Sequence, residues 1–149
     1  MTNMKRQFSG IANAFTQKCF AEFGQYFVED GNAILRIPAI SEEVGDVIVT
    51  DDGDELTCTV GQIDHRHFEV FCARGTDENQ REINAAEEAV SWVSAIVSDK
   101  VRFRIQMHQG RLVGSGSWYP EEEDAGPLLK ITDEWKEYLW SGQVLHCTR

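Results

Sequence analysis

The feature that most constrains this fold is an Asp52-Gly53 pair between two stretches of alternating residues. Asp-Gly in such a place predicts a β-hairpin with a two-residue turn, in which both turn residues have positive φ. Closing the chain there pairs Asp51 with Asp54, and the same pairing gathers the apolar residues of both strands on one face. That face consists of Val47, Val49, Leu56, Cys58 and Val60, and the other of Thr50, Glu55, Thr57 and Thr59. Turn chemistry and apolar pattern therefore agree on one register.

The segment from His65 to Cys72 follows this hairpin and alternates again, which predicts a further strand. A period of two places Phe68 on one face and His65, His67 and Glu69 on the other. Two imidazoles and a carboxylate on one face match the donor set of a 2-His-1-carboxylate site for zinc or iron(II). The alternative is that these three side chains form the hydrated face of a half-buried strand.

Two amphipathic helices are expected, one before and one after these strands in the chain. Apolar residues recur at steps of three and four over about residues 3–28, and Thr76 or Asp77 caps a second helix that runs to about Ser98. The apolar arc of the second helix covers about half of its circumference, because a stripe containing Trp92 lies beside the central one. That second stripe needs a partner, which could be the first helix, the C-terminal segment or another subunit in a homodimer.

A second hairpin is expected over residues 101–119, with its turn at Gln109-Gly110. The pairing that follows from this turn sets Phe103 against Gly116. In that register the polar face carries Arg102, Arg104, Ser115, Ser117 and Tyr119. The two arginines could bind a carboxylate or a phosphate through paired hydrogen bonds, which makes them candidate anion-binding residues. A solvated strand face without a ligand is the alternative.

A short strand around residues 33–37 and a short helix from Thr132 to about Gly142 complete the expected elements. Their order predicts an α+β two-layer sandwich, with a mainly antiparallel sheet of about five or six strands and helices on one face. No repeat and no linker divides the chain, so residues 1–149 are expected to form a single domain. This order of elements resembles that of the type III secretion chaperones, which are small acidic dimeric proteins.

The sequence is distinctly acidic, with 25 Asp and Glu against 14 Lys and Arg, a net charge of -11 and a pI near 4.7. Such a surface repels phosphate backbones and anionic membranes, so a basic protein is the favoured partner. Lys5 and Arg6 interrupt any signal-peptide core, and no stretch has the length of a membrane span. Cysteines without C-x-x-C spacing predict free thiols, buried at Cys19, Cys58 and Cys72. We therefore expect a cytoplasmic protein without a cofactor.

Carboxylates gather at the first hairpin turn and in a later loop, where they could steer a basic partner. The candidate partner-binding residues are Asp51, Asp52, Asp54, Glu55, Trp92, Glu121, Glu122, Glu123 and Asp124. The turn carboxylates could also bind calcium, although their spacing is not that of an EF-hand. The sequence thus predicts a non-enzymatic protein-interaction module, comparable to an immunity protein or a chaperone, that uses acidic loops and apolar helix faces. The alternative is a metal-binding protein or metal-dependent enzyme built on His65, His67 and Glu69.

Overall fold

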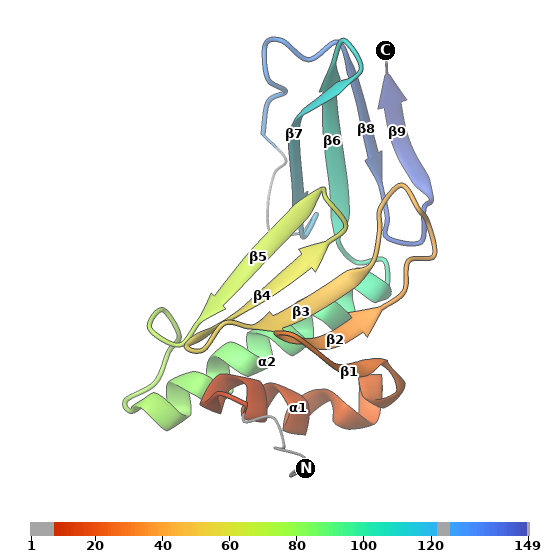
Figure 1. Ribbon diagram of the computed structural model, residues 1–149. Coiled ribbons are helices and arrows are strands. Elements are labelled where there is room, and N and C mark those ends of the chain that lie inside the picture. The colour runs from red at the N-terminus through yellow and green to blue at the C-terminus, as the bar shows by residue number, and fades with distance from the viewer. Residues whose placement is uncertain (1–7, 122–125, 149) are drawn as a thin grey trace. The chain divides into compact units, whose positions relative to one another are not determined.

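The computed structural model describes residues 8–121 and 126–148, which fall into two compact units. Unit 1 contains the chain up to Ile37, Val47–Thr59 and His65–Val93, and unit 2 contains Pro38–Asp46, Val60–Asp64 and the chain from Ser94 onward. Helices accompany antiparallel sheets, so the predicted α+β class is confirmed (Figure 1). The strands form two sheets, of five and four strands, where one sheet was expected. The expectation of a single domain stays a prediction.

The helices and strands follow one another along the chain in the order of their labels in Figure 1. The first part of the chain forms α1 (Gly10–Phe23), the 3-10 turn η1 (Gly24–Tyr26), β1 (Phe27–Asp30), β2 (Ala33–Ile37), β3 (Val47–Asp51), β4 (Glu55–Val60) and β5 (Asp64–Glu69). The second part forms α2 (Glu78–Val97), β6 (Arg102–His108), β7 (Arg111–Trp118), β8 (Glu134–Tyr138) and β9 (Val144–Thr148). No helix in the described part of the chain is long and apolar enough to cross a membrane.

In unit 1, strands that are consecutive in sequence are neighbours in the sheet, in the order β1-β2-β3-β4-β5. Both helices lie on the same side of this sheet (Figure 1). Helix α1 is shorter than the helix expected over about residues 3–28, of which residues 3–7 lie outside the described residues. Ser9 caps its start by accepting a hydrogen bond from the backbone N–H of Ala12. Its buried residues keep the expected spacing and are Ile11, Ala12, Phe15, Cys19 and Phe23.

The first hairpin has the predicted faces in a different register. Hydrogen bonds from Asp52 N–H to the Glu55 carbonyl and from Gly61 N–H to the Asp46 carbonyl set these residues opposite each other. The pairing is therefore shifted by two residues from the predicted one. Gly53 alone of the two expected turn residues has positive φ, at 98°. A shift of two leaves every side chain on its predicted face, and the five apolar residues of that face are all buried.

Helix α2 begins where its cap was predicted, because the Asp77 carboxylate accepts a hydrogen bond of 2.8 Å from the backbone N–H of Gln80. The sequence predicted a central apolar stripe and a second stripe beside it that contains Trp92. In the structure the second stripe is the more deeply buried of the two. Its residues are Ala85, Ala89, Trp92 and Ile96, each no more than 1% exposed. Ile83, Val90 and Val97 of the other stripe are only half-buried. The apolar arc is thus centred on Trp92.

In unit 2 the sheet has the order β7-β6-β8-β9, and the expected helix from Thr132 to Gly142 is wrong. Residues 134–138 form strand β8 instead, which pairs antiparallel with β6 and sets Tyr138 opposite Phe103. Both of these side chains are at most 1% exposed. A five-residue segment is too short for its apolar spacing to separate a helix from a strand. Residues 134–138 form a strand because their backbone groups pair with the edge of β6 that β7 leaves open.

The second hairpin has the predicted turn, and a bulge then changes its faces. Met107 pairs with Leu112 as expected, but the register shifts between Gln106 and Met107, and Phe103 pairs with Ser117. A shift of one residue moves every later side chain of β7 to the other face. Ser115 and Ser117 therefore do not share a face with Arg102 and Arg104, and the predicted polar face is wrong.

Candidate functional site

The carboxylates of the first hairpin turn differ in what they contact. Asp51 accepts hydrogen bonds from the N–H and hydroxyl of Ser9, at 3.0 and 2.6 Å, and so holds the start of α1. Asp52 accepts a hydrogen bond from the hydroxyl of Thr57, at 2.5 Å. Glu55 lies 3.6 Å from His67 Nδ1, whereas the side chain of Asp54 is exposed. Asp51 is therefore part of the framework of unit 1, whereas a role of Asp54 in partner binding stays a prediction.

The side chains of His65, His67 and Glu69 point to the same, exposed side of β5, as their parity predicted. The two imidazole rings meet edge to face, with 5.2 Å between their centroids, and His67 Nδ1 lies 3.1 Å from the hydroxyl of Thr57. Glu69 instead accepts a hydrogen bond of 3.0 Å from the thiol of Cys72. The part of the chain that the structure describes holds no group of three His, Cys, Asp or Glu residues that could bind a metal ion.

Two of the three cysteines expected in the core are buried there, and Cys72 is exposed. The hydrogen bond from the thiol to the carboxylate of Glu69 raises the pKa of Cys72, because a negative charge beside the sulfur disfavours the thiolate. Burial raises the pKa of Cys19 to about 12, with Glu22 as the second cause. Neither environment produces an activated nucleophile, because the thiolate is the reactive form of cysteine.

Trp92 belongs to the core of unit 1, where it is 1% exposed. The guanidinium carbon of Arg66, on the inner face of β5, lies 3.7 Å from the centre of the indole ring. This distance is that of a cation–π contact. Arg66 belongs to β5, which was not among the partners considered for this stripe. A homodimer stays a prediction of the sequence.

The two candidate anion-binding arginines have different surroundings. Arg104 donates hydrogen bonds to the backbone carbonyls of Gly126 and Pro127, at 3.0 and 3.5 Å, and so holds the loop that precedes β8. Arg102 lines a pocket in unit 2 together with Lys100. Of the acidic loop residues, Glu121 also lines this pocket, whereas Glu122, Glu123 and Asp124 lie outside the described residues.

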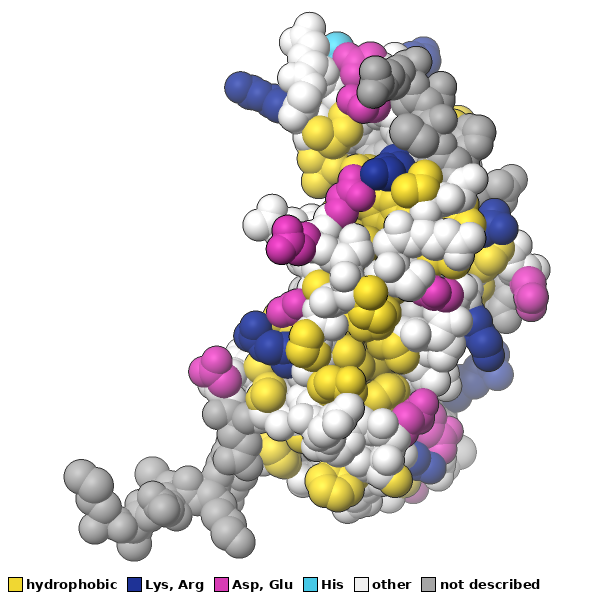
Figure 2. Space-filling model, turned by 90° about the vertical axis from the view of Figure 1, so that its right-hand side faces the viewer, with side chains coloured by type: hydrophobic (Ala, Val, Ile, Leu, Met, Phe, Trp, Pro, Cys, Tyr) yellow, Lys and Arg dark blue, Asp and Glu magenta, His cyan; other side chains and the backbone are white. Residues whose placement is uncertain are grey.

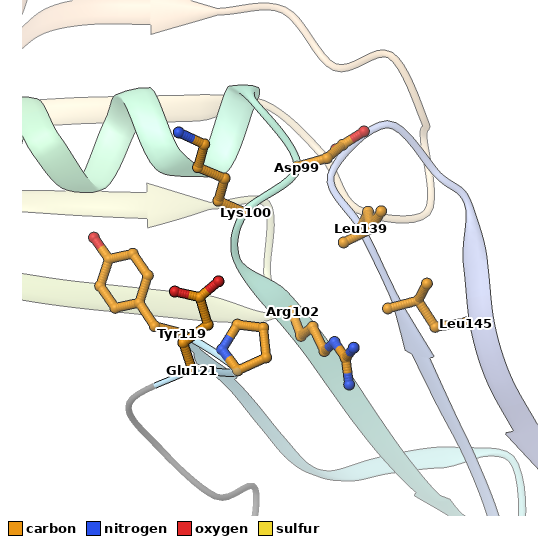
Figure 3. Close-up of a pocket in the computed structure, with 8 residues that line it drawn as sticks. Asp99, Lys100, Arg102, Tyr119, Glu121, Leu139 and Leu145 are labelled. Carbon is orange, nitrogen blue, oxygen red and sulfur yellow. The ribbon is translucent and has the colours of Figure 1, made fainter.

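This pocket of unit 2 has a volume of about 500 Å³ (Figure 3). Its lining residues come from the start of β6, the end of β7 and the β8–β9 hairpin, and are Asp99, Lys100, Arg102, Tyr119, Pro120, Glu121, Leu139 and Leu145. Arg102 extends toward the side formed by Leu139 and Leu145, and Tyr119 and Glu121 lie on the opposite side with Lys100 (Figure 3). The pocket thus combines separated charges with an apolar wall, which is typical of small-molecule sites.

The end of α2 fixes one wall of this pocket. Lys100 N–H donates to the Ala95 carbonyl and Asp99 N–H to the Ile96 carbonyl, the two hydrogen bonds of a Schellman motif. Asp99 takes the left-handed position of that motif, with φ of 59°, where glycine is the usual residue. Its carboxylate accepts a hydrogen bond of 3.0 Å from the backbone N–H of Ser141, at the turn between β8 and β9. The helix end and this turn are therefore held together.

Unit 1 has an apolar groove of about 350 Å³ between α1 and β1. It is lined by Phe8, Thr16, Phe20, Phe27, Val28 and Ile34. Phe20 stacks on Phe27 with 5.6 Å between ring centroids, yet 64% of Phe20 is exposed. Figure 2 shows hydrophobic side chains gathered in the lower half of the face that it presents. An aromatic pair exposed in this way is a feature of surfaces that bind other molecules.

Comparison with known proteins assigns no family, since no family model, no curated protein and no solved structure matches the chain. The site residues therefore rest on the geometry. The sequence prediction identified Arg102 and Glu121, but it missed the pocket and the groove. Both form where residues from separate elements meet, so no local pattern in the sequence marks them.

Proposed function

We propose that this chain is a non-enzymatic protein-interaction module, comparable in its role to an immunity protein or a chaperone, that binds an apolar segment of a basic partner protein along β1. The observation that carries the proposal is the apolar groove beside β1, in which 64% of Phe20 is exposed. A phenyl ring that leaves water on binding contributes about 2 kcal/mol. The groove therefore offers apolar surface of unit 1 that a partner could bury.

The position of β1 favours an extended segment as the ligand. Among the described strands of the five-stranded sheet, β1 has a neighbour on one side only, namely β2. The other edge of such a strand presents backbone N–H and C=O groups to which a further strand can pair. Peptides that add a strand in this way place alternate side chains in pockets beside the edge. Phe20 and Phe27 form the floor of such a pocket.

Charge at the end of β1 favours a basic partner. Asp30 pairs with Ala33, which in turn pairs with Thr50 near the acidic hairpin turn, so these acidic groups lie at the same end of the sheet. Asp30 and Asp54 are both exposed. A lysine or arginine that flanks the apolar segment would approach this end, and the net charge of -11 would speed the encounter.

The metal-dependent alternative has less support, because its ligands already have other contacts. Glu69 bonds to Cys72, and His67 lies beside Thr57 and Glu55. Metal binding by His65, His67 and Glu69 stays a prediction of the sequence.

The test uses a fluorescein-labelled peptide in which Val and Lys alternate, with binding followed by fluorescence anisotropy. Phe20→Ser is expected to weaken binding about tenfold or more, because it removes the exposed ring from the groove. Phe71→Ser is the matched control, since Phe71 belongs to the same unit, is 91% exposed and does not line the groove. Equal losses in the two variants would contradict the assignment of the groove.

Salt separates the charge contribution from the apolar one. Binding is expected to weaken with increasing ionic strength, and Asp54→Asn is expected to reduce that dependence. Chemical shift changes confined to β1 and α1 would support strand addition at the groove. Changes confined to the hairpin turn would contradict it and point to the acidic residues alone.

A further inference from the structure

The pocket of unit 2 holds two cations that are not used by the fold. No described residue forms an ion pair or a side-chain hydrogen bond with Lys100 or Arg102. Two other lysines of this acidic chain do have carboxylate partners: Lys136 lies 2.8 Å from Glu43 and Lys18 lies 2.8 Å from Glu87. A chain with 25 acidic residues could have paired both pocket cations as well. They instead line a concave space of about 500 Å³.

The apolar wall of the pocket narrows the kind of anion that fits. Arg102 extends toward Leu139 and Leu145, so the guanidinium group and the apolar side chains face the same part of the space (Figure 3). Leu145 is 37% exposed and therefore has apolar area to bury against a ligand. A guanidinium group binds a carboxylate through two parallel hydrogen bonds, and an alkyl chain buries favourably against leucine. A small inorganic anion would leave the leucines unused.

We propose that this pocket binds a medium-chain aliphatic carboxylate, with the carboxylate on Arg102 and the alkyl chain against Leu139 and Leu145. Lys100 adds a second positive charge on the opposite side of Arg102 from the leucines. The Schellman motif at the end of α2 and the hydrogen bond from Ser141 to Asp99 keep this wall in place before a ligand arrives. Such preorganisation lowers the entropic cost of binding.

Glu121 provides an internal test, because its carboxylate lines the same pocket and repels an anion. No described residue forms an ion pair or a hydrogen bond with the side chain of Glu121. Removing this charge while keeping the shape of the side chain should therefore tighten the binding of a carboxylate. Glu121→Gln is expected to lower the dissociation constant about threefold, the size of a partly screened charge interaction.

The experiment titrates the full chain with octanoate in a buffer free of carboxylates, with isothermal calorimetry and amide chemical shifts as readouts. Saturable binding is expected, with shifts at the start of β6 and in the β8–β9 hairpin. Arg102→Gln is expected to weaken it about tenfold or more, the loss of a charged hydrogen bond. Arg111→Gln is the matched control, because it removes the same charge from an exposed position of unit 2 outside the pocket. Equal losses in the two variants would overturn the proposal.

Octanol, acetate and the variant Leu145→Ser separate the contribution of Arg102 from that of the leucines. Octanol bound as tightly as octanoate would overturn the role of Arg102, and acetate bound as tightly would overturn the role of the leucines. Leu145→Ser should weaken octanoate but not acetate, and it serves as the second test if the arginine variant does not fold. Absence of saturable octanoate binding would overturn the proposal. None of these results depends on the groove of unit 1, so each proposal can fail alone.

Discussion

The two sheets of this protein cover their buried faces by different means. In unit 1 the covering elements are helices, and the buried positions of β3 and β4 are apolar side chains, among them Val49 and Leu56. In unit 2 a loop covers one face of the sheet, and the buried residue of β6 on that face is Gln106, at 6% exposed, whereas Phe103 is buried on the other face. Its amide oxygen accepts hydrogen bonds from Leu129 N–H and the Thr132 hydroxyl, at 2.7 and 2.8 Å.

The buried residues of the two sheets differ because a helix and a loop present different groups to the sheet that they cover. A helix satisfies its own backbone hydrogen bonds and presents only side chains, so the sheet beneath it is apolar. A loop presents backbone N–H and C=O groups that need partners once they are covered. Gln106 and Arg104 supply those partners in unit 2, the first to N–H and hydroxyl groups and the second to carbonyls. A polar residue in a strand is therefore no sign of exposure where a loop lies over the sheet.

The largest expected effect tests whether the two units unfold together. Phe15 is fully buried and meets Phe27 edge to face, with 6.5 Å between ring centroids. Phe15→Ala is expected to lower the free energy of unfolding of unit 1 by about 3–5 kcal/mol, through lost burial and the cavity that remains. Hydrogen exchange would measure it strand by strand. A single domain requires β6 and β8 to lose protection along with β3 and β4, and loss in β3 and β4 alone would contradict the single-domain prediction.

The second expected effect is a loss of stability when the hydrogen bonds between Gln106 and the covering loop are removed. Gln106→Leu keeps the approximate size of the side chain and removes the oxygen that accepts two hydrogen bonds. It is expected to cost about 2 kcal/mol, because the Leu129 N–H and the Thr132 hydroxyl lose their partner. Gln143→Leu, the same substitution at an exposed position of unit 2, is the control and should change stability by less than about 0.5 kcal/mol. Urea denaturation measures both, and equal costs would contradict the role of Gln106 beneath the loop.

The third effect is absent at neutral pH and appears only at alkaline pH. Burial, with Glu43 as the second cause, raises the pKa of Tyr138 from 10.0 to about 12. Below pH 10 the phenol is protonated in both the folded and the unfolded chain, so its contribution to stability is fully present. Between pH 10 and about 12 only the unfolded chain ionises, and stability falls by about 1.4 kcal/mol per pH unit.

Tyr138→Phe is expected to remove this part of the alkaline loss, measured by urea denaturation from pH 9 to 12. The raised pKa of Cys19 in unit 1 acts in the same direction over pH 9 to 12 and remains in both proteins. An unchanged pH dependence in Tyr138→Phe would mean that the phenol is not protected in the folded state.

Individual elements show how far sequence reasoning reaches. The faces of the first hairpin were predicted correctly although the register was not, because a shift of two residues preserves parity. The second hairpin had the correct turn and the wrong faces, because its bulge shifts the register by one residue. The strand at 134–138 was mistaken for a helix, since its pairing partner β6 lies about thirty residues earlier in the chain.

The sequence by itself determined the α+β class, the start of α2, the parity of β3 to β5 and the acidic charge. These depend on interactions within a few residues or on side-chain alternation, which can be read locally. The tertiary structure alone decided the division into two sheets, the bulge in the second hairpin, the groove beside β1 and the pocket around Arg102. Each of these depends on which distant segments meet, and the free energy of those contacts is not a property of any one segment.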